Sequence, residues 1–469
     1  MAESSTTKNN LLQQLADANS DFTNKIQEQY SDTSILEYKK QRIKELLQEP
    51  ILLANKACTI SRCPGRISLS KHADYINNDL LYVLDDRDIY IAAQTNDANK
   101  LILINQNSQF ENVELEQSQI AQVEKSKWYF YACQLYTQFV KDKQGITLVY
   151  NSDLPEAAGL SSSHALMIST AMALVSLDPN SEWQASLKTI ETRIENKDKI
   201  HDLLKLFQDI EHSRGFKSGL GDQSAQIFGK KDHFSFIKLE PNLEIIYQVI
   251  PKDLGIMTVT SSIKADKNLK EFQAANENIA AYKSINKIAE KYNCKFLGDL
   301  LYQYNEPVIF KILEDIEDPK LRGLALYGLA EGARVKELKD QLDASKLGAH
   351  LNLSHRAESN FKQEQGQWLA CSPKEQETYK FNTEESLASH SGIYHASTLI
   401  NDQLQDFSNS LDGVFGSSIS GAGLGGSNSI ICQRTQLNQI EQALIGGFHI
   451  HQKIYIHASS SSSAANTLR

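Results

Sequence analysis

The chain has 469 residues, of which 41% are hydrophobic and 23% charged, with a formal net charge of −10. These values are typical of a soluble globular protein of two or three domains, and the acidic balance argues against nucleic acid or an anionic membrane as the main partner. Six cysteines without C-x-x-C spacing, a polar start and no long apolar run predict a cytoplasmic protein without zinc, disulfides, signal peptide or membrane span.

The first 57 residues are rich in Gln, Asn, Asp, Lys and Ser, and Leu and Ile recur periodically over 34–53. This pattern predicts a frayed end followed by one or two helices packed on the outside, with a partner-binding arm as the alternative. From Thr59 the chain alternates as strands, and 60–69 reads as strand, turn, strand.

A polar loop follows that turn. Arg66, Lys71, His72 and Asp74 place four groups able to bind hydroxyls within nine residues. The alternative is a solvated loop whose charges pair with one another. Further strands are predicted over 80–105, followed by an aromatic-rich helix over 128–140, whose rings are more typical of a core than of a base-stacking platform.

A strand, a small-residue loop and a helix come next. The strand is 146–150, the loop runs from Pro155 through Gly159 to the serines at 161–163, and the helix covers 165–177. This arrangement directs free N–H groups and a helix dipole at an anion. Glycine allows close backbone approach, and serine hydroxyls can cap the helix or bind phosphate or a hard cation. An ordinary serine-capped helix is the alternative.

The next polar block contains Glu211, His212 and, after a Gly-x-Gly turn, Asp222 at the start of a helix. An acid in that position is either a helix cap or a functional group. Strands are predicted over 234–260, helices over 265–351, and a polar surface insertion without assigned function over 362–390.

A second glycine loop over 415–427 precedes a strand at 429–432. His449, His451 and His457 are evenly spaced and could bind a metal on one strand face, although a solvated edge strand fits better. The serine-rich residues 458–469 are low in complexity and predict a disordered tail.

Several nucleotide-binding motifs are absent or spurious. The chain has no G-x-x-x-x-G-K-S/T and no protein-kinase H-R-D or D-F-G. Gly421, Gly423 and Gly426 satisfy G-x-G-x-x-G, but a strand follows them where a dinucleotide fingerprint needs a helix.

The motifs that are present resemble those of the GHMP small-molecule kinases, and among them the galactokinase family. Cys63-Pro-Gly-Arg66 with His72-Ala-Asp74-Tyr resembles the signature P-G-R-V-N-L-I-G-E-H-T-D-Y. The loops at 155–163 and 420–426 resemble the ATP-binding loop and the third motif of the superfamily, and 211–223 resembles the block around its catalytic aspartate. The resemblance covers about residues 59–457.

The resemblance implies an α+β, two-domain GHMP kinase fold with the active site between the domains. The N-terminal domain, resembling ribosomal protein S5, would span 58–250. A ferredoxin-like and helical C-terminal domain would span 251–457, with the insertion inside it. Residues 1–57 would form a helical extension. Galactokinase-like proteins transfer the γ-phosphoryl group of ATP to a sugar, at the anomeric hydroxyl for galactokinases, so ATP, Mg²⁺ and a sugar are the implied ligands of a monomer or weak homodimer.

The family also implies roles for individual residues. Asp222 would take the proton of the sugar hydroxyl, and Arg66 would keep Asp222 ionised and stabilise the transferring charge. Ser162 and Glu211 would bind Mg²⁺. The residues expected to bind the sugar are Lys71, His72, Asp74, Gly219 and Phe272. The residues expected to bind ATP are Trp128, Gly159, Leu160, Ser161, Ser162, Ser163, Gly421, Gly423 and Gly425.

Four departures separate this sequence from the family pattern. Lys71 stands where a sugar-binding Glu is usual, His164 replaces an Ala, Ala422 replaces a Gly, and Phe272 takes the place of a Tyr. The reversed charge at Lys71 suggests that the substrate is not plain galactose and carries an acidic or otherwise modified group. His164 keeps open a galactokinase-like sensor that binds sugar and ATP without turnover. A GHMP kinase for another small alcohol is the third alternative.

Overall fold

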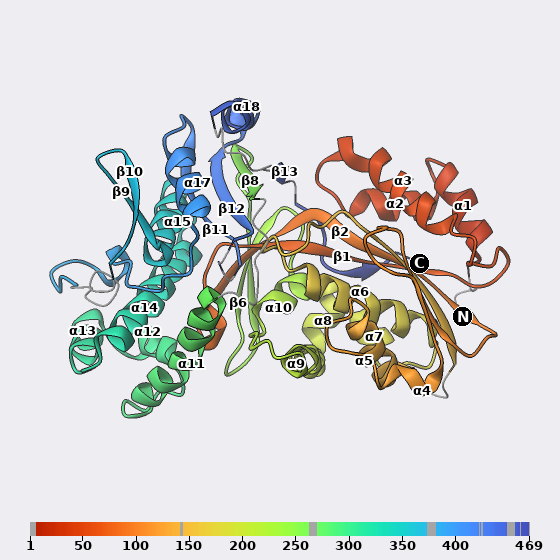
Figure 1. Ribbon diagram of the computed structural model, residues 1–469, viewed down its shortest axis with the longest axis horizontal. Coiled ribbons are helices and arrows are strands. Elements are labelled where there is room, and N and C mark those ends of the chain that lie inside the picture. Colours follow the sequence, from red (N-terminus) through yellow and green to blue (C-terminus); the bar gives the residue numbers. More distant parts are fainter. Residues whose placement is uncertain are drawn as a thin grey trace.

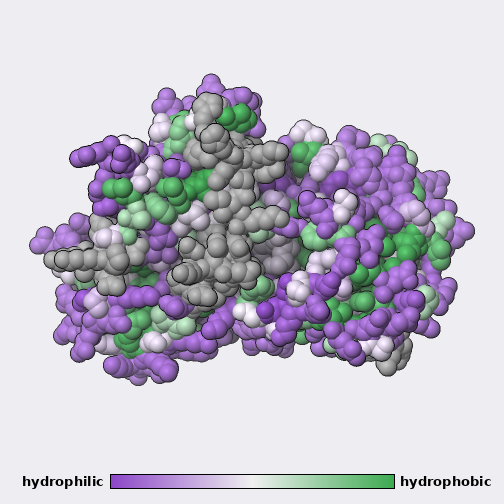
Figure 2. Space-filling view, viewed as in Figure 1, coloured by the Kyte–Doolittle hydropathy of each residue, from purple (hydrophilic) through white to green (hydrophobic). Residues whose placement is uncertain are grey.

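The computed structural model describes residues 6–140, 144–261, 270–372, 381–421, 423, 425–447, 455–459 and 461–468. It is a mixed α/β protein built on two sheets (Figure 1). Among the helices in these ranges, none is long and apolar enough to cross a membrane. Hydrophilic residues cover most of the face in Figure 2, and hydrophobic residues form small separate areas on both lobes.

The larger sheet has the strand order β14-β1-β2-β5-β3-β4, and β6 and β7 extend it from β2. Its axis is β2, a strand of 17 residues that pairs with β1 over residues 82–93, and with β5 over 89–96 and β6 over 80–82. The bounds are β1 Thr59–Ser68, β2 Leu80–Asn96, β3 Leu101–Asn105, β4 Val113–Leu115, β5 Gly145–Ser152, β6 His233–Lys238, β7 Glu244–Val249 and β14 Asn466–Thr467.

Helices cover one face of this sheet and bury the main hydrophobic core (Figure 1). The central helix, α6, is buried along most of its length because its sequence is apolar on every side. These helices are α4 Gln117–Ile120, α5 Phe130–Phe139, α6 Ser162–Leu177, α7 Gln184–Leu187, α8 Ile190–Glu195, α9 Lys197–Ser213 and α10 Gly221–Phe228.

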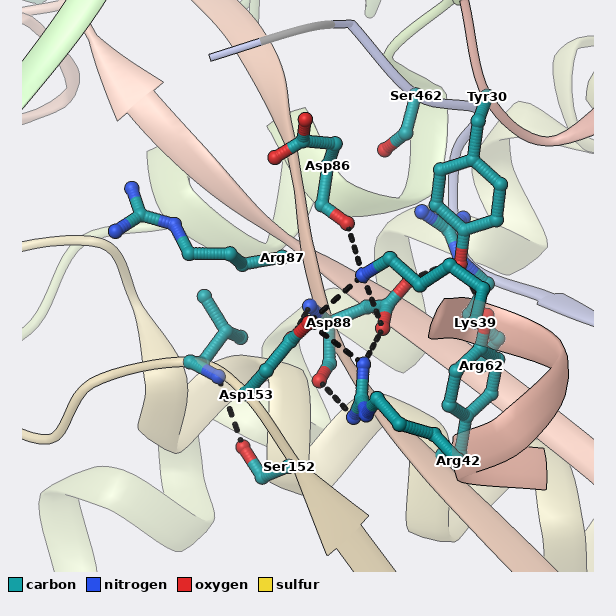
Figure 3. A network of polar contacts seen from close by, with 12 residues as sticks. Tyr30, Lys39, Arg42, Arg62, Asp86, Arg87, Asp88, Ser152, Asp153 and Ser462 are labelled. Carbon is teal, nitrogen blue, oxygen red and sulfur yellow. Dashed lines mark hydrogen bonds and ion pairs between the residues drawn. The ribbon is translucent and has the colours of Figure 1, made fainter. Parts of the chain in front are cut away.

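The N-terminal extension covers the opposite face with three helices, where one or two were predicted: α1 Lys8–Ala16, α2 Asp21–Glu28 and α3 Leu36–Leu47. A separate apolar core lies between them and the sheet. Beside that core, Lys39, Arg42 and Arg62 all point at the buried carboxylate of Asp88 (Figure 3). Burial alone would raise the pKa of Asp88, but these three cations lower it well below its usual range.

The second sheet is antiparallel, in the order β11-β12-β8-β13. Helices α17 and α18 pack on this sheet. Beside it, helices that include α11, α13 and α14 form another hydrophobic core (Figure 1). The strands are β8 Leu254–Thr260, β11 Val414–Ile419, β12 Ser427–Gln433 and β13 Tyr455–Ser459. The helices are α11 Lys270–Glu290, α12 Leu300–Gln303, α13 Glu306–Glu314, α14 Pro319–Asp340, α15 Ala344–Glu358, α17 Leu399–Asn409 and α18 Leu437–Gly447.

The chain changes sheets between β7 and β8, at residues 250–253. We propose the boundary between the domains 58–250 and 251–457 at this crossing. The insertion at 362–390 begins with an outlying hairpin, β9 Phe361–Glu364 and β10 Gln367–Ala370. It does not stay on the surface, since Leu387 and His390 at its far end are buried.

The predicted disordered tail is wrong for the residues that the structure describes between 458 and 468. After β13 the chain returns to the first sheet, where β14 pairs with β1. Ala464, Ala465 and Leu468 are buried, and buried arginines bind the carbonyl oxygens of Ser463 and Ala465. A serine-rich composition did not prevent order, because the edge of β1 and these arginines supply partners for the backbone.

Candidate active site

Arg66 and Asp222 meet, although 156 positions separate them. The Nε atom of Arg66 donates to Oδ1 of Asp222 at 2.6 Å, and Nη2 donates to Oδ2, which makes a bidentate ion pair. A register shift in β1 between Pro64 and Arg66 precedes the arginine. Its side chain is 4% exposed and that of Asp222 is 26% exposed, so the carboxylate is the accessible partner.

Asp222 lies in the first turn of α10, behind a turn that requires glycine. The carboxylate of Asp74 lies against this turn and accepts a hydrogen bond from the N–H of Gly221 at 3.0 Å. A Cβ atom on Gly219 would come within 1.9 Å of Asp74 Oδ2, so only glycine fits. The predicted residues Asp74, Gly219 and Asp222 therefore lie together.

The two carboxyl groups have opposite pKa shifts. Burial alone would raise the pKa of Asp222, but Arg66, followed by His164, lowers it. Burial raises the pKa of Asp74, and the nearby charge of Asp222 adds to that increase. Asp222 is therefore kept as an ionised acceptor at neutral pH.

The first glycine loop lies directly against Arg66. The Nη1 atom of Arg66 donates to the carbonyl oxygen of Gly159, and the N–H of Arg66 donates to that of Leu160 at 3.1 Å. Ser161 adopts a left-handed conformation and is the N-cap residue of α6. The structure thus brings the start of this helix next to the Arg66–Asp222 pair.

The second glycine loop packs backbone to backbone on the first. The hydroxyl of Ser420 donates to the carbonyl oxygen of Gly159 at 3.0 Å, and a Cβ atom on Gly159 would come within 2.3 Å of the carbonyl oxygen of Ser420. Gly421, Gly423 and Gly425 all have positive φ angles. Ala422 and Leu424 lie outside the described residues. Motifs separated by about 260 positions therefore form one small-residue surface.

His164 connects the residues expected to hold the metal and the base. Its Nε2 atom lies 3.2 Å from a carboxylate oxygen of Glu211, and its Nδ1 atom lies 3.7 Å from Asp222 and 3.0 Å from the hydroxyl of Ser161. Burial alone would lower the pKa of His164, but Glu211 and Asp222 raise it. The imidazole therefore lies between two acidic groups.

The expected metal ligands offer the hard oxygen donors that Mg²⁺ prefers. The hydroxyl in contact with Glu211 is that of Ser163, at 3.3 Å, and Tyr131 contacts the same carboxylate oxygen at 3.2 Å. Ser162 is the first residue of α6, next to this contact. A carboxylate and two serine hydroxyls at a helix start fit a divalent cation bound together with phosphate.

Lys71, which was expected to bind the sugar, is buried against the second half of the chain. It is 2% exposed, and its ammonium group donates to the carbonyl oxygen of Ile419, at the end of β11. Burial lowers the pKa of Lys71 to about 8, against the opposing effect of Glu358 and Glu331. The lysine thus connects the two halves of the protein, and it does not present a free cation to a substrate.

Two other expected ligand contacts have less support. The indole of Trp128 donates to the carbonyl oxygen of Glu111 at 3.0 Å and packs at right angles to Tyr129 and Tyr150. None of these contacts reaches the Gly159 loop. Phe272 belongs to α11, but its side chain lies outside the described residues.

Sequence reasoning missed several residues that face the polar loop from the second half of the chain. Glu331 accepts a hydrogen bond from the N–H of Lys71 at 3.0 Å, and Glu358 lies 3.4 Å from Nε2 of His72. The ring of Tyr394 stacks on His72 with the centroids 3.8 Å apart. These residues lie in or beside helices whose sequences carry no functional motif. The one signal in the sequence is a glutamate among apolar residues, at Glu331.

Of the three histidines considered as an alternative metal site, His449 and His451 lie outside the described residues. His457 lies on β13, at the edge of the second sheet as predicted. Its Nε2 atom is 2.5 Å from Asp86 and 3.6 Å from Asp85. The contacts are an ion pair that connects β13 to β2.

The chain is similar to several known proteins. Residues 128–230 match the family described as the GHMP kinases N terminal domain. The galactokinase of Thermotoga petrophila is 25% identical over 401 residues, which cover 83% of this chain and 94% of that protein. The galactokinase of Schizosaccharomyces pombe is 26% identical over 242 residues, or 44% of its length.

Solved structures show the same fold. Galactokinase of Lactococcus lactis, complexed with galactose, superposes with a TM-score of 0.67 at 18% identity, over 92% of this chain and 99% of that one. The mevalonate kinase of L. major superposes with a TM-score of 0.51 at 13% identity, over 86% of this chain and 96% of that one.

The fold, the paired glycine loops and the match over residues 128–230 make the chain similar to the GHMP kinases, and this similarity supports a phosphotransferase with an alcohol group as acceptor. Over most of its length the chain is similar to the galactokinase of Thermotoga petrophila, so the resemblance is to galactokinases in particular.

Proposed function

We propose that this protein transfers the γ-phosphoryl group of ATP to a hydroxyl of a sugar, and that the acceptor is the anomeric hydroxyl of galactose or a related sugar. The observation that carries the proposal is the Arg66–Asp222 ion pair next to the Gly159 loop. Phosphoryl transfer depends on positioning and on charge stabilisation more than on covalent help from the protein.

In this proposal Asp222 accepts the proton of the sugar hydroxyl. Its lowered pKa keeps it unprotonated at neutral pH, and its partial exposure leaves it accessible. Arg66 orients the carboxylate through two hydrogen bonds and offsets negative charge as the phosphoryl group moves. His72, Asp74 and Gly219 bind the sugar.

The two glycine loops hold the triphosphate. N–H groups over 159–163 and the start of α6 attract phosphate, and Gly421, Gly423 and Gly425 close the same surface from the second half. Ser162 and Glu211 would hold Mg²⁺, with Ser163 beside them. When bound, that ion neutralises phosphate charge. Trp128 remains a proposed ATP contact.

Measurement of ADP release with a panel of sugars tests the proposal. We expect wild-type protein to turn over at least one sugar, and Asp222→Asn to lower kcat by about 10²–10⁴-fold, the usual contribution of a general base. Asp198→Asn is the matched control, because Asp198 also lies in the first turn of a helix but is exposed. Sugar-dependent turnover by Asp222→Asn at the wild-type rate would contradict the proposal.

A sensor without turnover is the second candidate, and the position of His164 favours it. An imidazole between Glu211 and Asp222 competes for the acids that the metal and the sugar need. Binding of sugar and ATP without ADP release, detected by thermal shift, would support the sensor.

A further inference from the structure

A buried polar cluster lies between the polar loop and the second half of the chain. We call it the inner cluster: His72, Tyr282, Tyr327, Glu358 and Tyr394. Apart from His72, its members are at most 1% exposed. They come from four segments that meet here: the loop before β2, α11, α14, and the end of α15 with the stretch around 394.

Four polar atoms of the inner cluster have no hydrogen-bond partner among the described residues. They are Oε2 of Glu358, the hydroxyls of Tyr282 and Tyr394, and Nε2 of His72, whose polar contact is the ion pair with Oε1 of Glu358 at 3.4 Å. Buried polar groups are nearly always hydrogen-bonded in native proteins. A buried carboxylate oxygen and two buried tyrosine hydroxyls without partners in one cluster therefore indicate partners supplied by a ligand.

The aromatic rings of this region stack on one another beside His72. Tyr394 and Tyr282 lie nearly parallel, with an interplanar angle of 21° and centroids 6.5 Å apart. Tyr75 and Tyr282 are also parallel, at 7° and 6.4 Å. The hydroxyl of Tyr327 donates to Oε1 of Glu358 at 2.9 Å, which fixes the carboxylate and leaves Oε2 for another donor.

The protonation states of the inner cluster indicate which kind of ligand fits. Burial alone would raise the pKa of Glu358, but His72 and Lys71 lower it, so the group is an ionised acceptor. Burial raises the pKa of Tyr282 and Tyr394 well above the usual value, so both remain hydroxyl donors. The ammonium group of Lys71 is buried and donates to the Ile419 carbonyl oxygen, so it is not available to an anionic ligand.

The inner cluster adjoins the proposed site of transfer. His72 belongs to it and is followed two positions later by Asp74, which accepts a hydrogen bond from the residue before Asp222. The charge of Asp74 also acts on Tyr394. A sugar with its reacting hydroxyl at Asp222 would therefore extend toward Glu358.

We propose that Glu358, Tyr282 and Tyr394 bind the hydroxyls of the sugar that lie away from the transferred phosphoryl group, and thereby select a neutral or amino sugar against a uronic acid. This inference rests on the proposed function and replaces the acidic substrate suggested by Lys71 alone. The carboxylate that position 71 lacks is supplied by the second half of the chain.

Three conservative variants test the inference: Glu358→Gln, Tyr282→Phe and Tyr394→Phe. Each is assayed for KM and kcat with galactose, galactosamine and galacturonate, for the KM of ATP, and for the change in Tm that each sugar causes without ATP. Tyr136→Phe is the matched control, because Tyr136 is a buried tyrosine of α5 whose hydroxyl has protein partners.

We expect Glu358→Gln to raise the KM for galactose at least tenfold, to leave the KM for ATP within twofold, and to weaken the preference against galacturonate. The two Phe variants should raise the sugar KM without lowering Tm, because each removes an unpartnered buried hydroxyl. Tyr136→Phe should leave the KM of all three sugars unchanged. A purely structural role would instead lower Tm and leave the sugar KM unchanged.

The sugar-induced Tm shift separates this inference from the proposed function. If sugars raise Tm, the three variants abolish the shift, and no ADP forms, the inner cluster binds sugar although the kinase proposal fails. If sugars are phosphorylated and all three variants keep wild-type KM values, the inference is overturned. Galacturonate as the best substrate, or the absence of any sugar-induced shift in the wild type, also overturns it. Should Glu358→Gln fail to fold, the Phe variants decide.

Discussion

At the scale of single residues, the candidate site depends on charged neighbours that fix the protonation state of each other's side chains. Arg66 keeps Asp222 ionised, and His164 is held between Asp222 and Glu211. Lys71 shows how a single reversed charge can mislead. Its sequence position suggested a cation facing the substrate, but its ammonium group donates to the carbonyl oxygen of Ile419 and its backbone N–H donates to Glu331. The type of a residue therefore predicted its chemistry, and its partners decided its role.

His457 predicts a pH-dependent contribution to stability. Burial alone would lower its pKa, but Asp86 and Asp85 raise it, against the effect of Arg87. A histidine whose pKa is higher in the folded state than in the unfolded state stabilises the fold when it is protonated. This stabilisation is complete at a pH below the unfolded-state pKa of about 6.5, and it is lost as the pH rises through the folded-state pKa. We expect the Tm advantage of wild type over His457→Gln to be larger at pH 6 than at pH 8.5, measured by differential scanning calorimetry. An advantage that grows with pH would contradict this.

At the scale of elements, the N-terminal helices are held by charge as well as by apolar packing. The side chains of Lys39 and Arg42 in α3 reach Asp88 in β2, and Arg62 of β1 approaches it from the sheet (Figure 3). Periodic Leu and Ile predicted the helices. The ion network was not predictable, because its members are separated by up to 49 positions and each has an ordinary local sequence.

Asp88→Asn should be strongly destabilising, because it removes the carboxylate that three buried cations share, and of these only Lys39 and Arg42 also pair with Asp153. We expect a loss of about 3–5 kcal/mol in the free energy of unfolding, the usual cost of breaking a buried ion pair. Urea unfolding followed by circular dichroism measures it. Asp97→Asn is the control: Asp97 pairs with Lys56 but is 91% exposed, so its loss should cost less than about 1 kcal/mol. Equal losses of stability in the two variants would contradict the stabilising role of the Asp88 ion network.

At the scale of the whole molecule, the C-terminal segment joins the two sheets. It leaves the second sheet at β13, and its last strand pairs with β1 of the first sheet. On the way, Ser463 and Ala465 accept hydrogen bonds from Arg62 and Arg193 through their carbonyl oxygens. The same strand, β1, carries Arg66, so the segment supports the strand on which the site depends.

Deletion of residues 461–469 should therefore destabilise the protein. Arg62 and Arg193 would lose buried acceptors, at about 1–3 kcal/mol each, and the edge of β1 would lose its partner. The expected result is a lower urea midpoint with a reduced fraction of active protein. Ser463→Ala keeps the backbone acceptor and should behave as wild type. A deletion variant with the wild-type midpoint would show that the segment contributes nothing.

The sequence by itself determined the two glycine loops and the helix starts, because glycine turns, caps and hydrophobic periodicity are local features of the chain, and the resemblance of its motifs to those of galactokinases implied the class of fold and the pairing of Arg66 with Asp222. Tertiary structure alone decided that a serine-rich tail is ordered, that Lys71 is buried against the second half of the chain, and that Glu358 lies beside His72. The reason is physical: these outcomes depend on which partner satisfies a buried charge or a free backbone group, and those partners come from distant segments that meet only when the chain folds.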